Sequence, residues 1–137
     1  MDRSPIARSP LATYLDYLEQ GRLAYQRDTS NGAAVFYPRV IAPGTGAALE
    51  WHDSAGFGTV YATTVVHPQD GAPYNVALID LDEGFRMMSR VEDIAPTAVR
   101  IGQRVRFRTH RPRGDTGGQP SGDEPPCPVF FPAEPGA

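Results

Sequence analysis

Lysine is absent from this sequence, and all 13 basic residues among its 137 are arginine. They are outnumbered by 16 acidic residues, so the formal net charge is −3. A protein that binds nucleic acid without sequence preference usually has a clearly basic domain, because neutralisation of phosphates supplies most of its affinity. The acidic balance therefore argues against this class of protein.

Cysteine occurs once, as Cys127, and it lies between prolines. A single cysteine cannot form an internal disulfide. No histidine stands near it in the sequence to lower the pKa of its thiol, which disfavours a nucleophilic role. No apolar run is long enough to span a membrane. Together these absences predict a cytoplasmic protein with no membrane association.

Proline and glycine are abundant, with 14 of each, and they cluster at residues 1–10, 38–46, 112–126 and 132–136. Such clusters are typical of turns and irregular segments. We therefore divide the chain into a flexible N-terminus (1–9), a helix with a small β module (10–53), a barrel (54–132) that contains a flexible loop (111–126), and a tail (133–137).

Residues 10–20 have the pattern of a short amphipathic helix. Ser9 is a favourable N-cap, Pro10 suits the first turn, and Gly21 provides the C-terminal stop. Apolar side chains recur at helical spacing, at Leu11, Tyr14, Leu15 and Leu18. This apolar face either docks on the chain's own domain, which is the commoner case, or packs on a partner subunit.

The rest of the chain is rich in β-strand patterns. The longest runs from Gly56 through Gly58 to His67 without proline or formal charge, which is the composition of a strand packed on both faces. Asn31-Gly32 predicts a two-residue hairpin turn. Further strands are expected at 33–37, 48–51, 75–81, 85–91, 103–110 and 128–132. The predicted fold class is mainly β, with an N-terminal helix, a ribbon of short strands and a five-stranded OB-fold barrel.

The polar residues form no catalytic arrangement in the sequence. Asp80, Asp82 and Glu83 are close together, but they lie at a tight hairpin, where a role in the turn is the stronger interpretation. The histidines are dispersed, with no spacing typical of metal ligands: His52, His67 and His110. We therefore expect a protein that is not an enzyme on its own.

Arginines alternate with other residues along the strand expected at 103–110. Arg104, Arg106 and Arg108 should project from one face of this strand, because successive side chains of a strand point to opposite faces. One interpretation is a solvated outer face of the barrel. The other is a site for the phosphates of a coenzyme or for an acidic strip on a partner.

Three segments carry a resemblance to a known family. They are SAGFGTVYATTVVH at 54–67, PYNVALIDLDEG at 73–84 and IGQRV at 101–105. In this order and at these separations, they resemble the zinc-ribbon-plus-OB-fold proteins known as a domain of unknown function. The similarity extends from about Leu11 to Phe131 and implies a helix, a ribbon and an OB barrel.

Members of that family carry four cysteines in the ribbon, and the resemblance places them at Asp28, Asn31, Ala42 and Thr45. None of these residues can supply a thiolate, whereas a structural zinc site needs four soft or imidazole donors. The resemblance thus implies a degenerate, metal-free ribbon that binds no zinc. Because the folding contribution of a metal is missing, we expect this module to be the least stable part of the isolated chain.

The better understood members of the family are non-catalytic subunits, or fused domains, of thiolase-like acyl-CoA enzymes. The resemblance implies that this chain binds such a catalytic subunit in a hetero-oligomer, holds no cofactor stably, and helps form the passage for a coenzyme A thioester. The candidate residues for the coenzyme A passage are Gly56, Gly58, Tyr61, Arg86, Arg104 and Arg106. Those for the partner interface are Leu11, Tyr14, Leu15, Leu18, Phe36 and Trp51.

An alternative from a different class is a single-stranded nucleic-acid-binding protein. OB barrels bind single strands by stacking bases on aromatic side chains within a basic groove. The aromatic residues available for this are Tyr61, Tyr74, Phe85 and Phe107. The acidic net charge makes this the weaker interpretation, and nucleic acid is not the expected partner.

Overall fold

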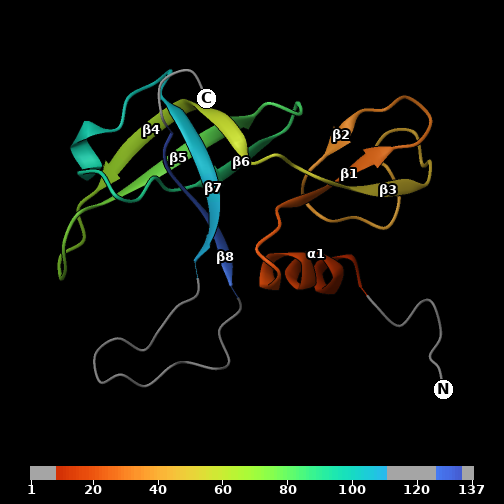
Figure 1. The fold of residues 1–137 in the computed structure, drawn as a ribbon, viewed down its shortest axis with the longest axis horizontal. Helices are drawn as coiled ribbons and strands as arrows, with labels where there is room; N and C mark the ends of the chain where they lie inside the picture. Colours follow the sequence, from red (N-terminus) through yellow and green to blue (C-terminus); the bar gives the residue numbers. More distant parts are fainter. Residues whose placement is uncertain (1–8, 111–125, 134–137) are drawn as a thin grey trace.

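The computed structural model describes residues 9–110 and 126–133. The flexible N-terminus, loop and tail predicted at 1–9, 111–126 and 133–137 lie outside these ranges, except for Ser9, Pro126 and Ala133. The described chain forms a three-stranded sheet accompanied by a helix and, beside it, a five-stranded sheet (Figure 1). In this part of the chain, the helices lack the length and apolar content that crossing a membrane requires.

Helix α1 spans Pro10–Glu19. Ser9 caps it as predicted, because its Oγ accepts a backbone hydrogen bond from the first turn at 3.1 Å. Tyr14 and Leu18 are buried, with 7% and 0% exposure. The hydroxyl of Thr109 in the barrel donates to the carbonyl of Leu18 at 3.0 Å. The helix therefore docks on the chain's own fold, which was the commoner of the two predicted cases.

The three-stranded sheet has the order β2-β1-β3, and both strand pairs are antiparallel. We call this sheet and helix α1 together the ribbon module. Its strands are β1 (Ala24–Asp28), β2 (Ala34–Val35) and β3 (Leu49–Asp53). The predicted two-residue hairpin at Asn31-Gly32 is wrong, since residues 29–33 connect the strands. The carboxylate of Asp28 accepts a hydrogen bond from the N–H of Ser30 at 2.8 Å, and this side-chain bond supports a wider turn.

The five-stranded sheet has the order β6-β5-β4-β7-β8, and all its neighbouring strands are antiparallel. Its elements are β4 (Phe57–Val66), β5 (Tyr74–Leu81), β6 (Arg86–Ser89), the 3-10 turn η2 (Pro96–Ala98), β7 (Arg104–His110) and β8 (Cys127–Pro132). After β6, Val91 forms a parallel bridge with Phe130. The N–H of Glu92 donates to the Phe130 carbonyl at 2.7 Å. This bridge joins the two edges of the sheet into the predicted five-stranded OB barrel.

Strand β4 is the central strand of the barrel, in agreement with the long strand predicted at 56–67. It pairs with β5 along most of its length and with β7 near its beginning. A β-bulge lies between Val60 and Ala62. Bulges bend a strand and increase its twist, so this one lets a single strand turn from one neighbour toward the other.

One hydrophobic core joins the ribbon module to the barrel. Phe85, in the connection between β5 and β6, stacks on Tyr25 with ring centroids 4.8 Å apart. It also stacks on Phe36 at 5.0 Å, with the rings 4° from parallel. Phe36 leaves the sheet to reach this stack, so β2 is shorter than the strand predicted at 33–37. The ribbon module therefore depends on a barrel residue for part of its core.

Candidate partner-binding and coenzyme-facing surfaces

A row of polar residues crosses the outer face of the barrel. The sheet register sets Arg86 opposite Asp80, Asp80 opposite Thr59, and Thr59 opposite Arg104. Arg86 binds the Asp80 carboxylate through Nε at 2.5 Å and through Nη2 at 3.2 Å. Arg104 binds both oxygens of Asp82, at 2.8 and 2.9 Å. Each of these two arginines is thus already neutralised by a carboxylate of the same chain.

These ion pairs change the proton affinity of their members. Hydrogen bonding to Arg104 lowers the pKa of the Asp82 carboxyl, and hydrogen bonding to Asp80 raises the pKa of the Arg86 guanidinium. Arg86 also lies 3.5 Å from the ring centroid of Tyr61, in a cation–π contact. Asp80 and Arg86 line a surface depression of about 450 Å³. Tyr61 and Arg86, both predicted to face the coenzyme, therefore form one contiguous surface.

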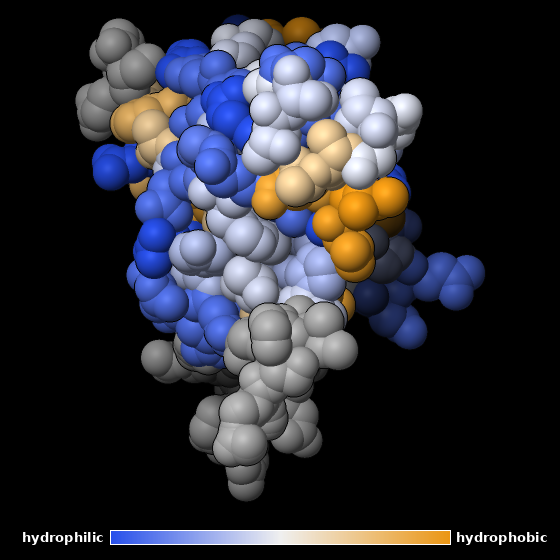
Figure 2. All heavy atoms as spheres, turned by 90° about the vertical axis from the view of Figure 1, so that its right-hand side faces the viewer, coloured by the Kyte–Doolittle hydropathy of each residue, from blue (hydrophilic) through white to orange (hydrophobic). Residues whose placement is uncertain are grey.

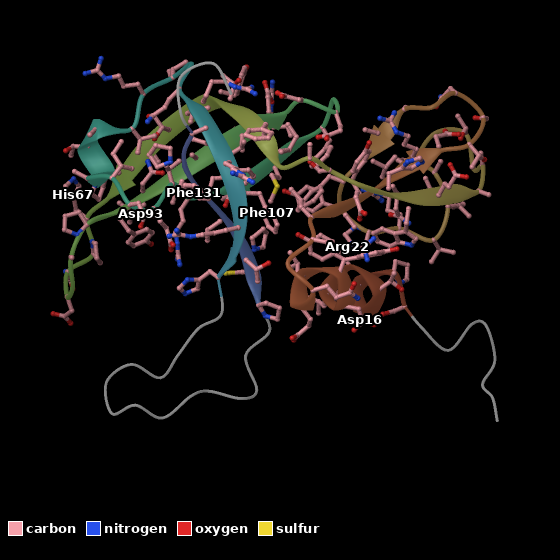
Figure 3. The ribbon with its side chains drawn as sticks, in the orientation of Figure 1. Asp16, Arg22, His67, Asp93, Phe107 and Phe131 are labelled. Carbon is pink, nitrogen blue, oxygen red and sulfur yellow. The ribbon has the colours of Figure 1, made fainter. Side chains whose placement is uncertain are left out.

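The other two arginines of β7 have different surroundings. Arg108 binds Asp93 at 2.9 Å and Glu92 at 3.0 Å, and Asp93 comes from the connection between β6 and β7 (Figure 3). Arg106 lies over the Phe57 ring, 5.3 Å from its centroid. Within residues 9–110 and 126–133, Arg106 makes no ion pair. Of the predicted arginine row, Arg106 is therefore the side chain most accessible to a phosphate.

The two glycines predicted to line a coenzyme passage are buried instead. Gly56 has a φ of +88°, and a Cβ at this position would lie 3.4 Å from the Cβ of Phe107. A Cβ at Gly58 would lie 2.8 Å from the carbonyl oxygen of Asp80 and 2.8 Å from Cγ2 of Ile79. The space beside Gly58 is filled by strand β5. The packing of the barrel therefore requires a residue without a side chain there.

Half of the predicted partner interface is buried inside the chain. Tyr14, Leu18 and Phe36 are at most 8% exposed, and the rings of Tyr14 and Phe36 pack edge to face at 5.6 Å. Leu11 stays at the surface, with 57% exposure. Two further members are partly buried against the same core: Leu15 and Trp51. The predicted interface is therefore wrong for Tyr14, Leu18 and Phe36, because the ribbon module uses these side chains for its own core.

The aromatic platform required for stacking nucleic-acid bases is also incomplete. Tyr61 and Tyr74 are about half exposed, at 50% and 47%. Phe85 is only 6% exposed, and the partly buried Phe107 packs against Phe130 with ring centroids 6.3 Å apart. Half of the predicted platform therefore belongs to the hydrophobic core.

At three of the four positions where the resemblance places cysteines, the side chains form hydrogen bonds. Asp28 is 2% exposed, and its Oδ1 accepts hydrogen bonds from the N–H and the hydroxyl of Ser30 at 2.8 and 2.5 Å. Its Oδ2 accepts one from the hydroxyl of Thr45 at 2.7 Å. Asn31 accepts a backbone hydrogen bond within its own turn at 2.8 Å. Ala42 offers only a methyl group.

This donor set does not fit a structural zinc site, which requires four thiolate or imidazole ligands in a tetrahedral array. In the described part of the chain, no three His, Cys, Asp or Glu residues are grouped so that they could hold a metal ion. The bond between Asp28 and Thr45, which we call the clasp, joins the two turns that the cysteine pairs would occupy. Hydrogen bonding therefore links the turns in this ribbon.

Replacing Asp28 by asparagine should reduce stability in a pH-dependent way. Hydrogen bonds from Ser30 and then Thr45 lower the pKa of the Asp28 carboxyl in the folded chain. A group with a lowered folded pKa stabilises the fold above its unfolded pKa, near 4, and this contribution is lost as the pH falls through the folded value. In urea unfolding, the stability gap between wild type and D28N should be constant above about pH 5 and shrink below about pH 4.

Asp70→Asn is the matched control, because Asp70 is exposed and the charge change is the same. The free energy of unfolding of D70N should change with pH in the same way as that of the wild type. A D28N gap that does not depend on pH would contradict the role of the ionised carboxylate. Stoichiometric zinc in the purified wild-type protein would contradict the metal-free ribbon.

One exposed segment was not singled out by the sequence patterns. Residues 38–46 have the composition of a Pro/Gly-rich turn, yet Val40 and Ile41 within it are 77% and 57% exposed. The available signal was a pair of branched aliphatic residues in a turn, where small and polar residues usually dominate. Gln26 contacts this segment and is a buried polar residue, with 3% exposure. The residues around Gln26 in the sequence did not indicate this contact.

The arrangement described above defines a class of protein: an OB-fold protein with an N-terminal helix and a small ribbon module. A family model described as the C-terminal OB-fold domain of ChsH2 matches residues 51–110. The chain is 37% identical over 97 residues to a DUF35 domain-containing scaffold protein of Methanocaldococcus jannaschii, an alignment that covers 64% of this chain and 69% of the relative. The chain belongs to the DUF35 family.

Two further similarities add structural and biochemical context. A solved structure described as the Ltp2-ChsH2(DUF35) aldolase matches with a TM-score of 0.72 and 31% identity, covering 96% of this chain and 100% of that one. A probable enoyl-CoA hydratase alpha subunit of Thermomonospora curvata is 33% identical over 100 residues, which cover 69% of this chain and 31% of the relative.

Proposed function

We propose that this chain is a non-catalytic accessory subunit that binds a thiolase-superfamily enzyme and helps form its acyl-CoA passage. The observation that carries the proposal is the match to a chain of the structure described as the Ltp2-ChsH2(DUF35) aldolase, which extends over 96% of this chain. The description of that structure names both a second protein and an enzyme activity. The scaffold description of the relative from Methanocaldococcus jannaschii supports the same role.

The surface charges support a non-catalytic role. Asp80, Asp82 and Asp93 each accept two hydrogen bonds from an arginine. Hydrogen bonding to Arg104 and Arg108 lowers the pKa of the Asp82 and Asp93 carboxyls, respectively, and an efficient general base at neutral pH needs a pKa near 7. These carboxylates therefore serve the barrel surface, and we assign the chemistry to the catalytic partner.

We extend the proposal to the coenzyme A thioester, because the relative from Thermomonospora curvata is described as a subunit of an enzyme of acyl-CoA chemistry. Arg106 is the side chain we assign to a coenzyme phosphate, since Arg86 and Arg104 already hold carboxylates. The Tyr61 ring, with Arg86 stacked on it, provides a flat surface beside the depression at Asp80. In this proposal the barrel contributes one wall of the passage and the partner contributes the other.

Co-expression with the thiolase-like enzyme encoded nearest to this chain tests the proposal. We expect the two proteins to elute as one complex in size-exclusion chromatography and the enzyme to lose most of its activity when expressed alone. The chain alone should show no turnover of acyl-CoA substrates. Separate elution together with full activity of the enzyme alone would refute the proposed function. A gel shift of a single-stranded oligonucleotide at low salt would favour the nucleic-acid alternative.

A further inference from the structure

The segment after β2 exposes apolar side chains at the end of the ribbon module. Tyr37, Val40 and Ile41 are 57%, 77% and 57% exposed, and we call residues 37–41 the aliphatic loop. Figure 2, which views the ribbon-module side of the molecule, shows hydrophobic residues gathered at one edge of this face. Contiguous exposed apolar residues of this kind mark interaction sites more often than isolated ones do.

The aliphatic loop is anchored from inside the module. The side-chain amide of Gln26 donates to the carbonyl of Arg39 at 2.9 Å, and its oxygen accepts from the Arg39 N–H at 2.9 Å. Directly after the loop, Ala42 is 2% exposed, and its N–H donates to the Ala47 carbonyl at 2.9 Å. The clasp at Thr45 follows. A loop held in one conformation loses little entropy on binding, which favours affinity.

The charges of the loop define the chemistry of its partner surface. Between Tyr37 and Ala47, the only charged residue at neutral pH is Arg39. Its side chain is exposed and makes no ion pair with the described residues. A complementary surface is therefore an apolar recess with a carboxylate at its rim, because a buried guanidinium without a counter-charge is costly.

We propose that the aliphatic loop, rather than the helix face, docks into such a recess on the catalytic partner. Val40 and Ile41 enter the recess, and Arg39 meets the carboxylate at its rim. This inference rests on the proposed function and specifies the surface that performs it. The buried Gln26 and the clasp fix the loop in position, so they act as positioning elements for the interface.

The double variant V40S/I41S tests the inference. Both side chains are exposed, so the variant should unfold at the same urea concentration as the wild type. Titration calorimetry with the purified catalytic partner should show at least tenfold weaker binding, which is typical of apolar anchors at an interface. R39E should also weaken binding, with a larger loss at low salt than at high salt.

Ile101→Ser is the matched control, because Ile101 is 70% exposed on the barrel, before β7. It removes an exposed aliphatic side chain elsewhere and should bind the partner like the wild type. If the wild type binds and V40S/I41S binds equally well, the inference is overturned while the proposed function stands. If the wild type does not bind the catalytic partner, both the inference and the proposed function fail. If light scattering shows that V40S/I41S disrupts a homodimer of this chain while partner binding is unchanged, the loop is a self-association site and the inference is overturned.

Discussion

Phe85→Ala is expected to lower the free energy of unfolding by about 3–5 kcal/mol, the usual cost of deleting a buried aromatic ring. Phe85 is 6% exposed and stacks on both Tyr25 and Phe36. The substitution therefore opens a cavity where the ribbon module meets the barrel. Because a domain of this size has only about 5–15 kcal/mol of stability, we expect the ribbon module to unfold at a lower urea concentration than the barrel.

The single tryptophan makes this effect measurable. Trp51 lies in β3, so its fluorescence reports on the ribbon module, whereas far-UV circular dichroism sums over α1 and the strands of both parts. In the wild type the two signals should change together, and in F85A the fluorescence should change first. Coincident transitions in F85A would contradict the role of Phe85 as the joint between the two parts.

Two variants control for a general loss of stability. Phe85→Leu keeps an apolar contact but removes the ring stacking. It should therefore lower the free energy of unfolding by about 0.5–1.5 kcal/mol for each aromatic pair lost. Phe131→Ala removes a partly buried ring from β8 (Figure 3), away from the ribbon stack. It should shift the fluorescence and circular dichroism transitions together.

Gly58→Ala is expected to destabilise the isolated chain by about 1–3 kcal/mol, and Gly58→Val by more, through overpacking. The added Cβ would lie 2.8 Å from the carbonyl oxygen of Asp80. This atom belongs to the backbone of β5, so it cannot move without disturbing the pairing of β4 with β5. Urea unfolding of the chain without any partner measures the effect.

This measurement separates a packing role for Gly58 from a ligand role. If Gly58 serves only a coenzyme passage, the alanine variant of the isolated chain keeps its stability and the complex loses activity. If it serves barrel packing, stability falls in the isolated chain. Thr64→Ala, at an exposed position of the same strand, should stay within about 0.5 kcal/mol of the wild type. Unchanged stability of G58A would restore the interpretation as a coenzyme passage.

The elements of the fold were predictable because their signals are local. The uninterrupted β composition of residues 56–67 predicted β4, and Ser9-Pro10 predicted the start of α1. The two-residue turn at Asn31-Gly32 was wrong, although the hairpin itself forms, because the side chain of Asp28 competes for the backbone of the turn and dipeptide preferences do not include that competition.

The candidate site was less predictable, because its properties depend on partners that are distant in sequence. Arg104 and Arg106 have the same local pattern, but only Arg104 lies beside the carboxylate of Asp82. Likewise, the sequence of the aliphatic loop does not show that Gln26 holds it in place.

By itself, the sequence determined the fold class and the long strand of the barrel, since both follow from residue type and short-range period. Only the tertiary structure decided that Tyr14 and Leu18 of the helix are buried, that Gly58 packs against β5, and that Val40 and Ile41 are exposed. The physical reason is that burial and charge pairing are set by sheet register and by packing between elements, which residues adjacent in sequence do not specify.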